Sequence, residues 1–149
     1  MADFPLPPMV LRNLADRSFD KRKQGAQEVE KIMRRMREEA TPDAIRRVLS
    51  ALASDYACSL NSNFRKGGLI ALASSAVGLV GLISEHLDLV VPPVLKSFSD
   101  QEPRVRYYAC ESLYNICKIS RCVWAFFWDG GGGEGGCTRV RDARAQRTP

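Results

Sequence analysis

Apolar residues recur at helical spacing along this chain of 149 residues. The clearest run lies near the middle, at offsets 0, 3, 4, 7, 8 and 11: Leu87, Val90, Val91, Val94, Leu95 and Phe98. This spacing places the run on one face of an amphipathic helix. After a turn, a second run follows with the same kind of period: Val105, Tyr108, Ala109, Leu113 and Ile116. The two runs predict a helical hairpin, and Pro92 and Pro93 are expected to bend its first helix.

Two earlier stretches show the same organisation. In the middle stretch, Thr41 and Pro42 supply an N-cap and a proline at the first helical position. The apolar face of the helix that follows is Ile45, Val48, Leu49, Leu52 and Tyr56, and a second helix is expected from about Ser62. The first stretch is shorter and resembles a terminal repeat. Its apolar positions are Met9, Val10 and Leu14 before the turn, then Val29, Ile32, Met33 and Met36.

One arginine column aligns the three units. Arg22, Arg65 and Arg106 are each followed three residues later by a small residue and seven residues later by an apolar one. Helical pairs recurring about every 40 to 47 residues are typical of armadillo and HEAT arrays, and the spelling of residues 100–106 favours HEAT. We therefore expect an all-α fold, a right-handed α-solenoid of about three HEAT-like helical hairpins at about 8–39, 42–82 and 84–120.

The chain changes character after Arg121. Residues 123–128 are apolar and strongly aromatic, and residues 130–136 hold six of the 11 glycines. The end, 139–149, is polar and basic without periodicity. We expect a repeat array over 4–121 and a non-repeat tail over 122–149, disordered from Gly130 onward. The aromatic run could fold back over the last helix.

Composition is that of a single globular domain, with 45% hydrophobic and 26% charged residues. A net charge of +5 is too mild to imply nucleic acid or membrane, and no nucleic-acid partner is expected. Five cysteines without a CxxC pair fit a reduced, cytosolic chain, and the start does not have the pattern of a signal peptide. The uncharged stretch Gly67–Ser84 approaches membrane-spanning length, but its Gly, Ala and Ser content favours a buried helix.

Catalytic motifs are not found. His86, the one histidine, is expected to be a surface or helix-start residue without an acidic or cysteine partner in its segment. Cys110 and Cys117 are expected to be buried and inert. The glycine run is not a phosphate-binding loop because no GK[ST] follows it. We expect no enzyme, no metal site and no cofactor.

Candidate binding residues are few: Arg22, Arg65, Lys66, Arg106 and Tyr107. The arginines could form a binding ladder, or they could bridge to turn aspartates and hydrogen-bond exposed carbonyls, which we favour. Tyr107 falls outside the apolar face of its helix and is expected to be exposed, as interface aromatics are. The basic cluster between Arg12 and Arg47 also contains acidic residues, which favours a solvated surface over an anion-binding one.

Two segments are spelled more specifically than a HEAT repeat requires: Phe64–Ala73, FRKGGLIALA, and Arg104–Ile116, RVRYYACESLYNI. Together with Asp20–Lys23 ahead of Glu28–Lys31, they resemble the amino-terminal HEAT repeats of the ArPIKfyve family, vacuole-morphology scaffolds that are associated regulators of PIKfyve. The resemblance covers about residues 4–121. From Cys122 the family continues with another helical repeat, whereas this chain continues with its tail, as a truncated isoform or a read-through product would.

The resemblance implies a non-catalytic scaffold of a PIKfyve-type lipid kinase, peripheral on endosomal and vacuolar membranes, that supports synthesis and turnover of phosphatidylinositol 3,5-bisphosphate. In such proteins the amino-terminal repeats serve the kinase. A distant carboxyl-terminal region binds the Sac-type lipid phosphatase and drives oligomerisation, so neither is expected here. Two alternatives remain open: a basic helical module that binds anionic lipid or RNA directly, and a non-functional truncation product.

Overall fold

The computed structural model describes residues 6–120 of the chain, and this part is helical. Six α-helices follow one another: α1 (Pro8–Leu14), α2 (Phe19–Glu38), α3 (Pro42–Ala51), α4 (Ser62–Gly78), α5 (Leu87–Lys96) and α6 (Pro103–Ser120). Short turns of other helix types extend them: a π-helical η1 (Leu52–Ala57) after α3, and 3₁₀ turns η2 (Ile83–Glu85) and η3 (Ser97–Ser99) around α5. The aromatic run and the glycine-rich tail lie outside the described residues.

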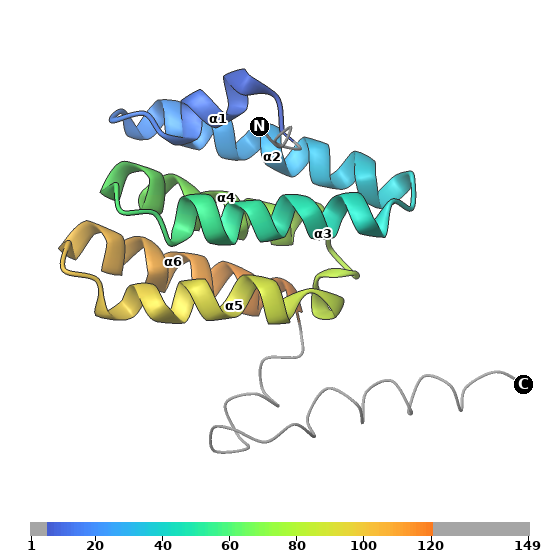
Figure 1. The fold of residues 1–149 in the computed structure, drawn as a ribbon. Coiled ribbons are helices and arrows are strands. Elements are labelled where there is room, and N and C mark those ends of the chain that lie inside the picture. The colour runs from blue at the N-terminus through green and yellow to red at the C-terminus, as the bar shows by residue number, and fades with distance from the viewer. Residues whose placement is uncertain (1–5, 121–149) are drawn as a thin grey trace, which may run out of the picture.

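The helices form three stacked layers, each made of two helices that run back on one another (Figure 1). The layers are α1 with α2, α3 and η1 with α4, and α5 with α6. The second helices α2, α4 and α6 pack side by side through the stack, so α4 lies between its two neighbours (Figure 1). One apolar core runs through all three layers, from Leu6 to Ile116.

The predicted core positions are largely confirmed. In the middle layer Ile45, Val48, Leu49, Leu52 and Tyr56 are all buried. The outer positions of two predicted faces are not: Leu95, Phe98 and Met9 are exposed. Helical spacing identifies the face of a helix, but the amount of that face that is covered depends on the neighbouring layer.

The uncharged stretch 67–84 is explained by close packing of α4. A Cβ atom added at Gly67 would come within 1.9 Å of the carbonyl oxygen of Leu14, and one at Gly68 would lie 2.4 Å from the backbone nitrogen of Ala57. Only glycine permits this approach of α4 to the first helices of two layers. No helix in the described part of the chain is long and apolar enough to cross a membrane.

One local expectation, the cap of α3, needs revision. Thr41 is the residue that precedes α3, but its side chain does not cap that helix, because its hydroxyl donates to the carbonyl oxygen of Met36 at 3.1 Å. The hydroxyl therefore closes the end of α2. Helix α5 runs through Pro92 and Pro93 as far as Lys96 and then tightens into η3, where the Ser97 hydroxyl donates to the carbonyl oxygen of Pro93 at 2.9 Å.

Candidate interaction surface

The three column arginines make the same pair of hydrogen bonds. In each case Nη1 donates to the carbonyl oxygens five and six residues earlier in the chain. The respective distances are 2.8 and 2.8 Å for Arg22, 2.8 and 3.0 Å for Arg65, and 3.2 and 2.7 Å for Arg106. These carbonyls belong to the turn between the two helices of a layer. The contacts therefore match the favoured expectation, in which the arginines hold the turns.

A second set of contacts joins the middle layer to the third. Arg65 places Nε 2.7 Å from Oδ2 of Asp100, and its Nη2 donates to Oδ1 at 3.1 Å. The ammonium group of Lys66 lies 2.6 Å from Oε1 of Glu102. Charge-assisted pairs of this kind are stronger than neutral hydrogen bonds, and both partners here are at least partly shielded from water.

These contacts lower two carboxyl pKa values. Burial alone would raise the pKa of Asp100, but the hydrogen bonds from Arg65 and from the backbone amide of Glu102 outweigh it and hold the pKa below its ordinary value. The pKa of Glu102 is lowered chiefly by its hydrogen bond with Lys66. Both groups are therefore carboxylates at neutral pH, as the ion pairs require.

Arg22 connects the first layer directly to the third. Its Nη2 lies 3.4 Å from the hydroxyl oxygen of Tyr108, and its guanidinium carbon is 5.8 Å from the centroid of the Tyr108 ring. The ring of Phe19 stacks on the same tyrosine with centroids 6.3 Å apart. Residues 86 positions apart in the sequence are thus in contact.

The five candidate binding residues therefore differ in what they offer a partner. Arg22 is only 3% exposed and Lys66 7%, and both are engaged inside the stack. Arg65 and Arg106 are partly buried at the turns. Tyr107 is 67% exposed, as its place outside the apolar face predicts. A partner-binding role for these residues stays a prediction.

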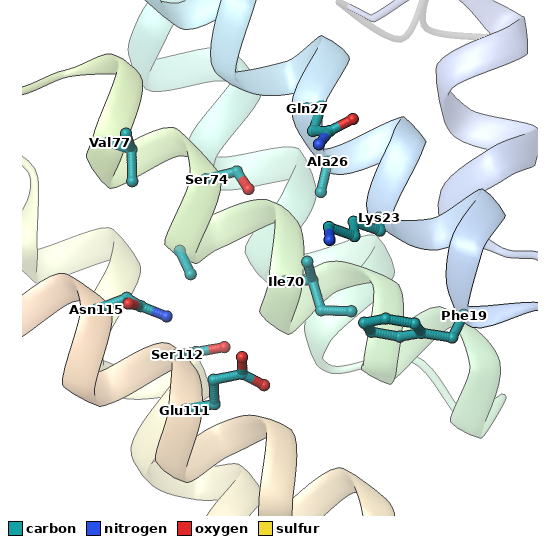
Figure 2. A pocket seen from close by; sticks show the side chains of 11 residues that line it. Phe19, Lys23, Ala26, Gln27, Ile70, Ser74, Val77, Glu111, Ser112 and Asn115 are labelled. Atoms are coloured by element: carbon teal, nitrogen blue, oxygen red, sulfur yellow. The ribbon is translucent and has the colours of Figure 1, made fainter.

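The second helices also form a groove that the sequence did not reveal. It has a volume of about 310 Å³ and is lined by one side of α2, α4 and α6 (Figure 2). Its apolar part includes Ala26, Ile70 and Val77, while Lys23 on α2 and Glu111 on α6 bring opposite charges to it. The remaining lining residues are Phe19, Gln27, Ala73, Ser74, Ser112 and Asn115. Mixed apolar and polar lining of this kind suits a protein segment.

The histidine and cysteine residues that the structure describes do not form a catalytic or metal site. His86 directly precedes α5, as the helix-start reading predicts, but it is buried and so is not a surface residue. Its Nδ1 has no hydrogen-bond partner among the described residues. Burial lowers the pKa of His86. The prediction of a buried Cys110 is wrong, since this residue is exposed, while Cys117 is half-buried. Within residues 6–120, no cluster of histidine, cysteine and carboxylate side chains could hold a metal ion.

The stacked helix pairs define the chain's class as a helical-repeat protein, with a groove along its second helices. Comparison with known proteins gives the family. Residues 63–128 match the family described as "Vacuolar 14 Fab1-binding region". A protein VAC14 homolog of Arabidopsis thaliana is 45% identical over 83% of this chain. The yeast Saccharomyces cerevisiae has a vacuole morphology and inheritance protein 14 that is 40% identical over 75% of it.

The matched stretch belongs to the VAC14 family, and the predicted resemblance to vacuole-morphology scaffolds is confirmed. A third relative, the protein VAC14 homolog of Schizosaccharomyces pombe, is 38% identical over 76% of the chain. The chain spans only 13–17% of the length of these three relatives. The family match ends at residue 128, whereas the repeat array is predicted to end at residue 121. The end of the array at 121 stays a prediction. No solved structure gives a significant match.

Proposed function

We propose that this chain is a right-handed α-solenoid of HEAT-like hairpins that acts as a non-catalytic scaffold and binds a Fab1/PIKfyve-type lipid kinase through the groove on α2, α4 and α6. One observation carries this proposal. Helix α6 and all of α4 except its first residue lie within residues 63–128, the match to a Fab1-binding region. These two helices supply seven of the groove's eleven lining residues. Most of the groove's lining thus comes from the segment that matches a family described as Fab1-binding, and α2 supplies the rest.

The wider role follows from the same assignment. By holding the kinase, the scaffold would support the synthesis and turnover of phosphatidylinositol 3,5-bisphosphate on endosomal and vacuolar membranes, where it would be peripheral. A Sac-type phosphatase is not proposed as a direct partner of this chain, because the resemblance places that contact in a distant region of such scaffolds.

Direct binding of anionic lipid or RNA has less support. Several basic side chains between Arg12 and Arg47 are paired with acidic ones: Lys21 with Asp16, Lys31 with Glu28, Arg34 with Glu30, and Arg46 with Asp88. These pairs offset the charge of four of the 11 basic side chains in this stretch, and so reduce the positive charge that a phosphate group would meet.

The test is co-precipitation of the full chain with a PIKfyve-type kinase at low and high salt, with a longer VAC14 protein as positive control. The variant Ser74→Arg places a long charged side chain in the groove, whereas Ser50→Arg places it on the exposed side of α3. We expect capture at both salt concentrations, a several-fold loss with Ser74→Arg, and no loss with Ser50→Arg. Equal capture by the two variants would exclude the groove. Capture lost at high salt for every form would indicate binding through exposed charge instead.

A further inference from the structure

Helix α6 carries an exposed apolar ridge on its outer side. Tyr107, Cys110, Tyr114 and Cys117 lie at offsets 0, 3, 7 and 10, which places them along one side of the helix. Tyr107 is 67% exposed and Tyr114 66%; Cys110 is also exposed, and Cys117 is half-buried. We call these four residues the α6 ridge. Exposed tyrosines in a row are unusual enough on a small domain to indicate a covered surface.

The repeat shows what covers the same position elsewhere. A shift of 41 residues maps the α6 ridge onto Lys66, Leu69, Ala73 and Ala76 of α4, and all four are buried. This side of α4 faces the third layer, since Lys66 pairs with Glu102 and the carbonyl oxygen of Leu69 accepts from the Ser112 hydroxyl at 2.9 Å. The α6 ridge is therefore the surface on which a further segment would pack.

The free side of Arg106 indicates that this further segment carries a negative charge. It holds its turn through Nη1, as Arg65 does, but Arg65 also uses Nε and Nη2 to bind the carboxylate of Asp100 in the following layer. Among the described residues, Arg106 has hydrogen bonds only through Nη1. A carboxylate beside the start of α6 would complete the same arrangement.

The chain itself provides a segment with this chemistry. Residues 123–128, VWAFFW, begin three positions after the end of α6, and Asp129 follows them directly. Arg106 lies 14 residues before Ser120 in the helix, a distance of about 21 Å. The nine residues from Ser120 to Asp129 can span about 30 Å when extended, which leaves enough chain for the reversal.

We propose that residues 123–128 pack back along the α6 ridge and that the carboxylate of Asp129 pairs with Arg106 as Asp100 pairs with Arg65. The segment covers the end of the stack. Because it is tethered to α6, its effective concentration at the ridge is high and no second molecule is needed.

Tryptophan fluorescence of the full chain tests this directly, because the chain's two tryptophans, Trp124 and Trp128, both lie in the segment. We expect blue-shifted emission and weak acrylamide quenching that do not change on dilution. Asp129→Asn should increase quenching several-fold, whereas Asp142→Asn, which alters another acidic residue of the tail, should leave it unchanged. Tyr114→Lys should also increase quenching, and Met9→Lys, at an exposed position of α1, should not.

Far-UV circular dichroism of each variant shows that the helices remain folded, so that increased quenching reports on the segment alone. Emission of the native chain equal to that of the denatured chain would overturn the proposal. Shielding that disappears on dilution would also overturn it, because the α6 ridge would then be covered by a second copy. Equal effects of Asp129→Asn and Asp142→Asn on quenching would contradict the proposed ion pair between Asp129 and Arg106.

Discussion

At the scale of single residues, the ion pair between Arg65 and Asp100 is the best defined contact between layers. The variant Asp100→Asn keeps an oxygen for the backbone amide of Glu102 but removes the charge that Arg65 binds. We expect a loss of about 1 to 3 kcal/mol in the free energy of unfolding at pH 7, since a partly buried arginine is left without its partner. Urea unfolding of the variant and the wild type measures this loss. Glu28→Gln, in an exposed pair with Lys31, is the control and should change stability little.

The two carboxylates of these ion pairs, Asp100 and Glu102, also make the free energy of unfolding depend on pH in the acid range. The pKa values of Asp100 and Glu102 are lower in the folded chain than in the unfolded one, so the unfolded chain binds protons first as pH falls. The stabilisation is complete above the unfolded pKa, about 4, and is lost below it. The difference between wild type and Asp100→Asn should therefore shrink as urea unfolding is repeated from pH 6 down to about pH 3. A difference that does not change with pH would contradict the assignment.

His86 gives a second pH dependence in a separate range. Burial, the main cause, lowers its pKa in the folded chain, so the unfolded chain takes up the proton first. Stability should then be full above the unfolded pKa of about 6.5 and fall as pH drops below it. Because the chain has one histidine, His86→Gln should abolish the dependence between about pH 7 and 5.5. An NMR titration of the imidazole checks the direction of the shift.

At the scale of elements, α4 depends on two glycines that a helix would ordinarily avoid. Replacing glycine by alanine inside a helix gains about 1 kcal/mol of propensity, but at Gly67 and Gly68 the new methyl group would meet backbone atoms that cannot move aside. We expect Gly67→Ala and Gly68→Ala each to destabilise the fold by at least about 2 kcal/mol. Gly25→Ala, whose nearest contacts are 3.1 Å away, should have a clearly smaller effect. Thermal unfolding ranks the three.

Helix α4 should also be the most protected element. It packs against α1, α2, η1 and α6, whereas α1 and α5 lie at the ends of the stack. Amide hydrogens in the centre of α4 should therefore exchange most slowly, and those of α1 most rapidly. Hydrogen exchange followed by NMR or mass spectrometry would show this. Protection spread evenly over all three layers would indicate that the stack opens only as a whole.

At the scale of the whole molecule, the sequence predicts local relations better than distant ones. The hydrogen bonds of the column arginines could be predicted because donor and acceptors are five or six residues apart in one turn. The pair between Arg65 and Asp100 could be anticipated in kind, because turn aspartates are expected partners of the column arginines. The hydrogen bonds to the turn carbonyls therefore follow from the repeat alone, whereas the ion pair also needs an aspartate in the next turn.

The groove and the contact between Arg22 and Tyr108 could not be predicted in this way. The groove needs the relative rotation of α2, α4 and α6, which helical periodicity does not give. Arg22 differs from Arg65 because the next turn carries Ser59 where the third has Asp100, so no carboxylate faces it at the equivalent position. Its Nη2 instead reaches Tyr108, two layers away.

The contact between Arg22 and Tyr108 has a mechanical consequence. In a helical-repeat stack each layer touches only its neighbours, so the stack can bend like a spring and its curvature is soft. Here Arg22, Phe19 and Tyr108 act as a strut between the first and third layers, on the side where the second helices begin. The strut resists opening of the stack on that side, so the elastic bending of this segment should be stiffer than that of a stack joined only layer to layer.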